Sequence, residues 1–99
     1  MKSPILDEHT AAHVAELFRA LSDTRRVRIL SAILEREVNI SALAEMIGLT
    51  ESAVSHHMRS LRMLRLVKSR RDGKEVYYSM DDPHLIALFQ QGIRHVHEE

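Results

Sequence analysis

The sequence predicts a mainly α-helical domain with one small β-hairpin, an α+β arrangement in the order ααααββα. Apolar residues recur at three- and four-residue steps along most of the 99 residues, which is the period of an amphipathic helix. Near residue 70 this pattern changes to two strand-like runs, Val67 to Arg71 and Lys74 to Met80, joined by Asp72-Gly73. An Asp-Gly pair is typical of the two-residue turn of a β-hairpin.

Length and composition indicate one domain. Residues 1–7 show no periodicity and are expected to form a flexible tail, while residues 8–99 form the domain. The chain has no Cys, which excludes disulfide bonds and thiolate metal sites and fits a reducing compartment. No stretch resembles a signal peptide or a membrane span, so we expect a cytoplasmic protein with no membrane partner. The formal net charge is zero, which argues against a generally basic protein.

Two helices are predicted in the first third of the chain. The first begins near Glu8, and the second follows Ser22-Asp23, a pair that suits the end of one helix and the cap of the next. His9 and His13 lie one turn apart in the first helix; we expect them to be solvated, with a metal-binding pair as the alternative. Three arginines surround the apolar residues of the second helix, and each either contacts phosphate or is solvated: Arg25, Arg26 and Arg28.

A short helix, a Gly-containing turn and a longer helix follow. Asn39 or Ser41 is expected to cap the first of these helices, and Gly48 to end it in a left-handed conformation. Thr50 then caps a helix over about Glu51 to Leu64. This succession is the signature of a helix-turn-helix. The longer helix carries an inward apolar stripe made of Val54, Met58 and Leu61.

The opposite face of that helix carries short hydroxyls and basic side chains at helical spacing: Ser52, Ser55, His56, Arg59 and Arg62. Short hydroxyls let a helix enter the major groove of DNA, where Arg and His reach base edges and phosphates. Between Ser52 and Lys74, seven Lys or Arg residues stand against a single acid, Asp72. Such a local excess of positive charge favours an anionic partner, here double-stranded DNA. An ordinary solvated polar face is the alternative.

The predicted hairpin follows directly and has a basic tip, made of Arg70, Arg71 and Lys74. In the predicted register Arg70 lies opposite Glu75, a favourable cross-strand pair. A basic hairpin after a helix-turn-helix is a wing, which suits contact with phosphates or the minor groove. The predicted fold is therefore a winged helix-turn-helix that ends in one further helix.

That last helix places candidate metal ligands at both of its ends. Asp82 suits the cap and Pro83 the first helical position. His84 and His95 are eleven positions apart, so they share a face but lie roughly 16 Å apart along the axis, too far for one ion. Two antiparallel copies would join Asp82 and His84 of one to His95 and Glu98 of the other, at two symmetric sites. On spacing alone, caps and solvated charges are the favoured explanation of these four residues, and the metal site is the alternative.

Apolar surface beyond the needs of one small core also predicts a homodimer, joined through the first and last helices by Phe18, Leu85, Leu88 and Phe89.

A metallohydrolase is a different class of function, and it needs an open coordination position and a general base. The sequence contains no H-E-x-x-H motif and no nucleophile motif, so we expect no enzyme. A winged-helix DNA-binding protein that does not respond to metal is the other alternative.

Two motifs resemble those of a known family, the metal-responsive ArsR/SmtB repressors. The run ESAVSHHMRSLRMLRLV from Glu51 to Val67 is similar to the recognition helix of that family. The four residues Asp82, His84, His95 and Glu98 match the zinc site on its last helix. The resemblance implies a zinc-responsive repressor that binds operator DNA as an apo homodimer and releases it when metal binds.

One departure from the family pattern bears on the metal. Many relatives carry Cys near the start of the third helix, where this chain has Asn39. Soft ions that prefer sulfur are therefore not expected, and zinc, cobalt or nickel remain. His97 lies about 100° around the helix from Glu98, and we expect it not to be a ligand.

Overall fold

The computed structural model describes residues 4–98 of the chain. Its elements are α1 (Glu8–Ala20), α2 (Thr24–Ala32), β1 (Val38–Asn39), α3 (Ile40–Ile47), α4 (Glu51–Met63), β2 (Lys68–Asp72), β3 (Glu75–Ser79) and α5 (Pro83–His97). The predicted helical fold with one hairpin is confirmed, and a short strand that the residue pattern did not indicate, β1, joins the hairpin. None of the helices within residues 4–98 has the length and apolar character that crossing a membrane requires.

Side chains cap the starts of the helices. The carboxylate of Asp7 accepts the backbone N–H of Thr10 at 2.7 Å, so the last residue of the predicted tail 1–7 forms the start of α1. Residues 1–3 of that tail lie outside the described residues. Of the two candidate caps for α3, Asn39 is the one used, since its side chain accepts the backbone N–H of Ala42 at 2.7 Å.

The turn between α3 and α4 has the predicted chemistry. Gly48 ends α3 at φ 80°, a left-handed conformation that costs glycine little because it has no Cβ. Its N–H and that of Leu49 both donate to the carbonyl of Ala44, at 2.9 and 3.0 Å. Thr50 then caps α4 by accepting the N–H of Ala53 at 3.0 Å. These bonds set the angle at which α4 leaves α3.

The core lies between α2, α3, α4 and the sheet. Its fully buried side chains are Ile29, Leu30, Ile33, Leu43, Val54, Met58 and Leu61. The predicted inward stripe of α4 is therefore confirmed, because all three of its members belong to this set. Burial of such side chains contributes roughly 1.5–3 kcal/mol each, and it fixes which face of α4 points outward.

The hairpin register differs from the prediction by the position of the turn. Asp72 pairs with Glu75, and Arg70 lies opposite Tyr77, so the predicted pairing of Arg70 with Glu75 is wrong. Gly73, at φ 62°, takes the first position of the turn. A turn with glycine at that position needs no positive φ at the second, which suits Lys74. The sheet order is β1-β3-β2, and all pairs are antiparallel.

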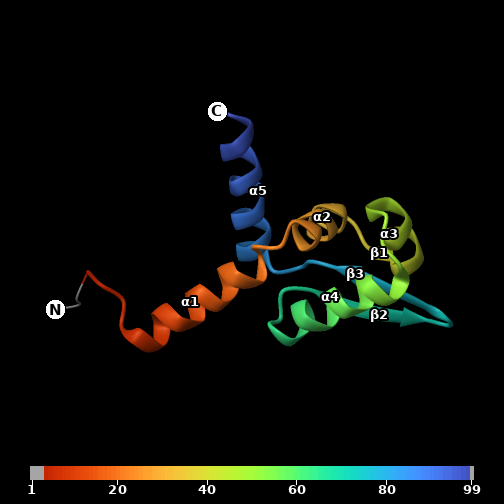
Figure 1. Ribbon diagram of the computed structural model, residues 1–99, viewed down its shortest axis with the longest axis horizontal. Helices are drawn as coiled ribbons and strands as arrows, with labels where there is room; N and C mark the ends of the chain where they lie inside the picture. The colour runs from red at the N-terminus through yellow and green to blue at the C-terminus, as the bar shows by residue number, and fades with distance from the viewer. Residues whose placement is uncertain (1–3, 99) are drawn as a thin grey trace.

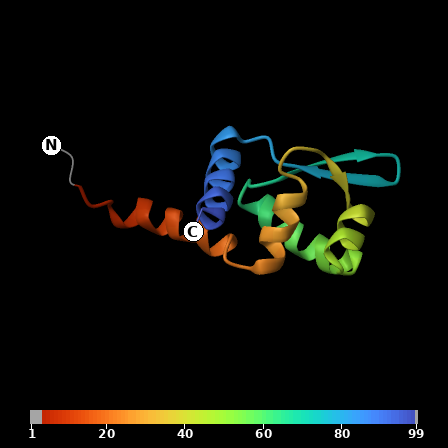
Figure 2. The same cartoon turned by 90° about the horizontal axis from the view of Figure 1, so that it is seen from above.

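Helices α1 and α5 project from the body formed by α2, α3, α4 and the sheet, α1 to one side and α5 upward (Figure 1). Seen from above, α1 extends away from the wing (Figure 2). Leu85 and Phe89 are only 5% and 8% exposed, so they fill the core of the single chain and are not the surplus surface that the sequence suggested. Phe18 and Leu88, on the projecting helices, are 52% and 37% exposed and remain as apolar surface.

Candidate DNA-binding surface and metal-binding positions

The outer face of α4 presents the residues that the sequence predicted for base contacts. Ser52, His56 and Arg59 are exposed, and Ser55 is half-buried. Burial of the opposite stripe turns these four side chains outward together. The N-terminus of α4 adds the positive end of the helix dipole, which favours phosphate. This face therefore presents short hydroxyls and basic side chains opposite a buried stripe, as insertion into a groove requires.

Near the start of this face, the carboxylate of Glu51 accepts a hydrogen bond from the hydroxyl of Ser41 at 3.0 Å. That contact draws the one acid of the α4 outer face toward α3. The basic residues further along the helix, Arg59 and Arg62, are exposed. Charge along α4 therefore becomes more positive toward its C-terminal half.

The three predicted basic residues of the wing differ in whether another residue of the protein binds them. Arg70 donates to both carboxylate oxygens of Glu37, at 2.8 and 3.0 Å, and its guanidinium lies 4.7 Å from the centre of the Tyr77 ring. The hydrogen bond from Arg70 lowers the pKa of the Glu37 carboxyl. Arg71 and Lys74 are exposed, and neither takes part in a salt bridge within residues 4–98. Arg71 and Lys74 are thus the side chains most available to phosphate.

At the start of α5, Asp82 and His84 form one pair of candidate ligands. The Asp82 Oδ1 atom caps the helix by accepting the N–H of His84 at 2.9 Å. The same oxygen lies 3.5 Å from His84 Nδ1, and the side chains are 50% and 97% exposed. The cap positions the carboxylate next to the imidazole while both remain open to solvent. Such oxygen and nitrogen donors suit zinc, cobalt and nickel.

The second pair of candidate ligands lies at the other end of α5. His95 and Glu98 are three residues apart and both are exposed. Among residues 4–98, the structure brings no three His, Asp or Glu side chains together in a way that could hold a metal ion. The four predicted ligands are therefore placed as two separated pairs at opposite ends of one helix.

Three further histidines lie outside these two pairs of candidate ligands. The rings of His9 and His13 lie 4.4 Å apart on α1, and both residues are exposed. His97 lines an apolar groove between α1 and α5.

All three arginine side chains of α2 contact polar groups of other residues in the chain. Arg26 donates from Nε to His57 Nδ1 at 3.2 Å, Arg28 donates to the carbonyl of Ile47 at 3.2 Å, and Arg25 pairs with Asp23 at 3.5 Å. The sequence left phosphate contact or solvation open for Arg26. The structure shows instead a hydrogen bond from Arg26 to His57.

His57 is a residue that the sequence reasoning did not single out. It is 7% exposed, and it lies three residues after Val54 and four before Leu61. That spacing places it beside the buried stripe of α4, and the signal was therefore present in the sequence.

The chain matches the family model of the bacterial regulatory proteins of the arsR family over residues 23–69, which run from the cap of α2 into the wing. It is 44% identical over 88 residues to the transcriptional repressor SmtB homolog of Synechocystis sp., covering 89% of this chain and 67% of that protein. It is 41% identical over 86 residues to the cadmium resistance transcriptional regulatory protein CadC homolog of Staphylococcus aureus, covering 86% and 71%.

Among solved structures, the homodimeric winged helix-turn-helix DNA-binding domain of Mycobacterium bovis superposes with a TM-score of 0.80 at 27% identity, covering 98% of this chain and 92% of that one. Fold, wing and sequence thus agree with these regulators. The chain belongs to the arsR family of bacterial regulatory proteins, the ArsR/SmtB-type metal-responsive transcriptional repressors, which is a family of DNA-binding proteins and not of enzymes.

Proposed function

We propose that this protein is a zinc-responsive repressor in the cytoplasm, which binds operator DNA as an apo homodimer and leaves it when zinc binds. The observation that supports the proposal is that two pairs of candidate ligands lie at opposite ends of α5. Each pair supplies one imidazole and one carboxylate, which is half of a tetrahedral set.

A second copy of the chain is the natural occupant of the apolar groove between α1 and α5. The groove has a volume of about 440 Å³, and Phe18, Leu88, Ile93 and Val96 are among the residues that line it. Val96 is 64% exposed. Exposed apolar surface of this kind marks protein interfaces. Because the groove runs along α5, a two-fold axis through it would make the two copies of α5 neighbours.

In an antiparallel pair of α5 helices, Asp82 and His84 of one copy would face His95 and Glu98 of the other. Each of the two sites would then have two imidazoles and two carboxylates, and no coordination position would remain open for a substrate. Thiolate ligands are absent because the chain has no Cys, and Asn39 is engaged as a helix cap. The donor set therefore favours zinc, with cobalt and nickel as the alternatives of the same chemistry.

Operator DNA would contact α4 through Ser52, Ser55, His56 and Arg59, and the wing through Arg71 and Lys74. In this arrangement α4 reads base edges in the major groove, while the wing holds the backbone. Arg70 would contribute less than the sequence suggested, because Glu37 already binds its guanidinium.

The decisive experiment is an operator-binding titration of the purified protein in metal buffers of zinc, cobalt and nickel. Tight binding without metal and weaker binding at low free zinc would support the proposal. Stronger weakening by cobalt or nickel would change the metal but keep the mechanism. An operator affinity that none of the three ions changes would favour a winged-helix protein that does not respond to metal.

A further inference from the structure

One partly buried polar contact joins the inner face of α4 to the junction of α1 and α2. His57 is the single polar residue in the buried set of residues 4–98, and its Nδ1 atom accepts a hydrogen bond from Arg26 Nε at 3.2 Å. A guanidinium can only donate, so Nδ1 must be unprotonated and the imidazole neutral. The contact therefore exists in one protonation state of the histidine.

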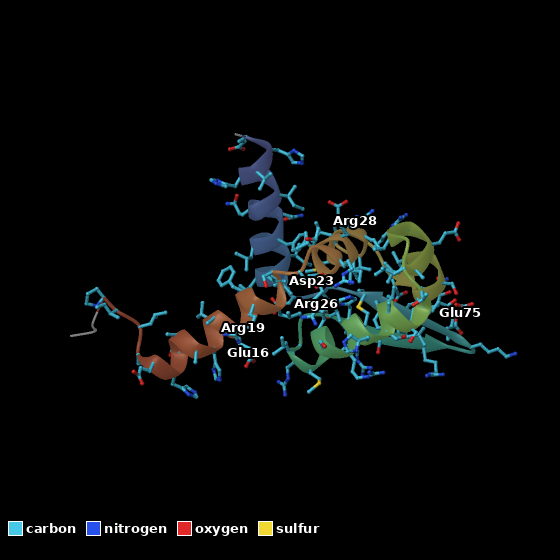
Figure 3. All side chains as sticks on the ribbon, viewed as in Figure 1. Glu16, Arg19, Asp23, Arg26, Arg28 and Glu75 are labelled. Carbon is cyan, nitrogen blue, oxygen red and sulfur yellow. The ribbon has the colours of Figure 1, made fainter. Side chains whose placement is uncertain are left out.

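Arg26 extends the link beyond α4. It lies in the first turn of α2, where its N–H is one of two that donate to the cap residue Asp23. Its Nη1 atom also donates to the carbonyl of Ala20, the last residue of α1, at 3.5 Å. Asp23 and Arg26 lie where α1 turns into α2, beside α4 (Figure 3). A single guanidinium thus contacts α1, α2 and α4.

We propose that His57 is a positioning residue for DNA binding. Through the bond from Arg26 it fixes α4 against the α1–α2 junction, and protonation of its imidazole releases that link and weakens operator binding. The inference rests on the proposed binding of operator DNA. It adds a proton as a second ligand, at a place distinct from the metal-binding positions of α5.

The electrostatic surroundings make the neutral form of His57 the stable one. Burial lowers its pKa, and the charges of Arg26, Arg25 and His56 lower it further, while Asp23 acts in the opposite direction. The folded pKa therefore lies below the ordinary value of about 6.5. The unfolded chain takes up the proton first, so the free energy of unfolding falls as pH drops from about 6.5 toward the folded pKa.

The neighbouring histidine is replaced in every protein of the experiment. His56 is exposed on the outer face of α4, among the predicted DNA contacts, whereas protonation of His57 on the inner face would place a cation against Arg26. The response of His57 is therefore measured in a His56→Asn background.

The experiment compares metal-free operator binding from pH 7.5 to pH 5.5 for His56→Asn and for His56→Asn combined with His57→Asn. In His57→Asn, Oδ1 lies the same number of bonds from the backbone as Nδ1 of histidine, so it accepts from Arg26 but does not titrate in this range. We expect the first protein to lose affinity several-fold, but by less than the roughly tenfold limit that a single group with the ordinary pKa of about 6.5 would give at pH 5.5. We expect the second to lose about twofold or less. Circular dichroism at each pH confirms that the proteins are folded.

A third protein, in which His57→Leu is combined with His56→Asn, removes the acceptor at similar volume. It should bind weakly already at pH 7.5 and show little pH dependence. Equal pH dependence in the first two proteins would overturn the inference alone. If the wild type binds operator at no pH tested, the proposed function is overturned, and this inference with it.

Nitrogen-15 NMR of the imidazole gives a readout that does not need DNA. His57 should appear as the neutral Nε2–H tautomer with a pKa below 6.5, and Arg26→Leu should raise that pKa. A His57 that titrates at or above the ordinary value in the folded protein would also overturn the inference.

Discussion

At the scale of single residues, a cap decides where each helix begins. Asn39 and Ser41 are both suitable by type, yet only Asn39 bonds the first turn of α3. Ser41 instead donates to the exposed carboxylate of Glu51. The difference depends on backbone conformation, because the cap position must be extended, as Asn39 is at ψ 162°.

Replacing the cap should therefore cost more than replacing its neighbour. We expect Asn39→Ala to lower the free energy of unfolding by about 1 kcal/mol, as for other lost caps. Ser41→Ala should change it by less than about 0.5 kcal/mol, as is usual for an exposed contact. Urea denaturation followed by circular dichroism measures both. A larger loss for Ser41→Ala would show that the contact with Glu51 matters more than the cap.

His95 is the residue on which the metal response should depend most directly. We expect His95→Ala to bind operator like the wild type without metal, and to stay bound when zinc is added, because one imidazole of each site is missing. The control is His97→Gln, which changes a histidine on the groove side of α5 and should keep the response. Anisotropy of labelled operator DNA measures both. Zinc-induced release of His95→Ala would contradict the assignment.

At the scale of elements, the wing shows how a partner elsewhere in the chain changes the role of a residue. Arg70 and Arg71 are neighbours in β2, but alternation along the strand points them to opposite faces. Arg70 meets Glu37 and Tyr77, whereas Arg71 remains exposed.

The two arginines should therefore differ in DNA binding. We expect Arg71→Ala to weaken binding to all sequences alike, and to reduce the slope of log affinity against log salt by roughly 0.9 for each lost phosphate contact. Arg70→Ala should change that slope less, since its charge is already paired with Glu37. Binding titrations at several salt concentrations give both slopes. Equal reductions would show that DNA displaces Glu37 from Arg70.

At the scale of the whole molecule, the exposed apolar faces of α1 and α5 predict a homodimer. We expect Val96→Glu to give a monomer in sedimentation velocity, because it places a charge in the groove between these helices. The control is Met63→Glu. Met63 is 79% exposed on α4 and does not line the groove, so this variant should remain a dimer. A wild type that sediments as a monomer at micromolar concentration would contradict the proposed assembly.

The same dimer should couple metal and DNA in both directions. If zinc lowers operator affinity by a given factor, operator DNA must lower zinc affinity by the same factor, because linkage is reciprocal. A coupling of about 3 kcal/mol would correspond to roughly 150-fold. Zinc titrations of the protein with and without operator measure the reverse effect. Tighter zinc binding in the presence of operator would contradict the proposed direction.

Much of this architecture could be predicted from the sequence because its signals are local. The helical period, the caps Asp23, Asn39 and Thr50, and the terminator Gly48 each depend on residues within one turn of the chain. The two pairs of candidate ligands on α5 could also be proposed from the sequence, since spacing along one helix sets which side chains share a face, and their binding of metal stays a prediction.

The tertiary structure decided what depends on contacts between distant segments. Arg70 is bound by Glu37, 33 residues away, and Arg26 by His57, 31 residues away, so neither pair can be read from local pattern. Leu85 and Phe89 looked like dimer surface, but the single chain buries them. Sequence period shows that a side chain lies on an apolar face, whereas only packing decides which neighbour covers it.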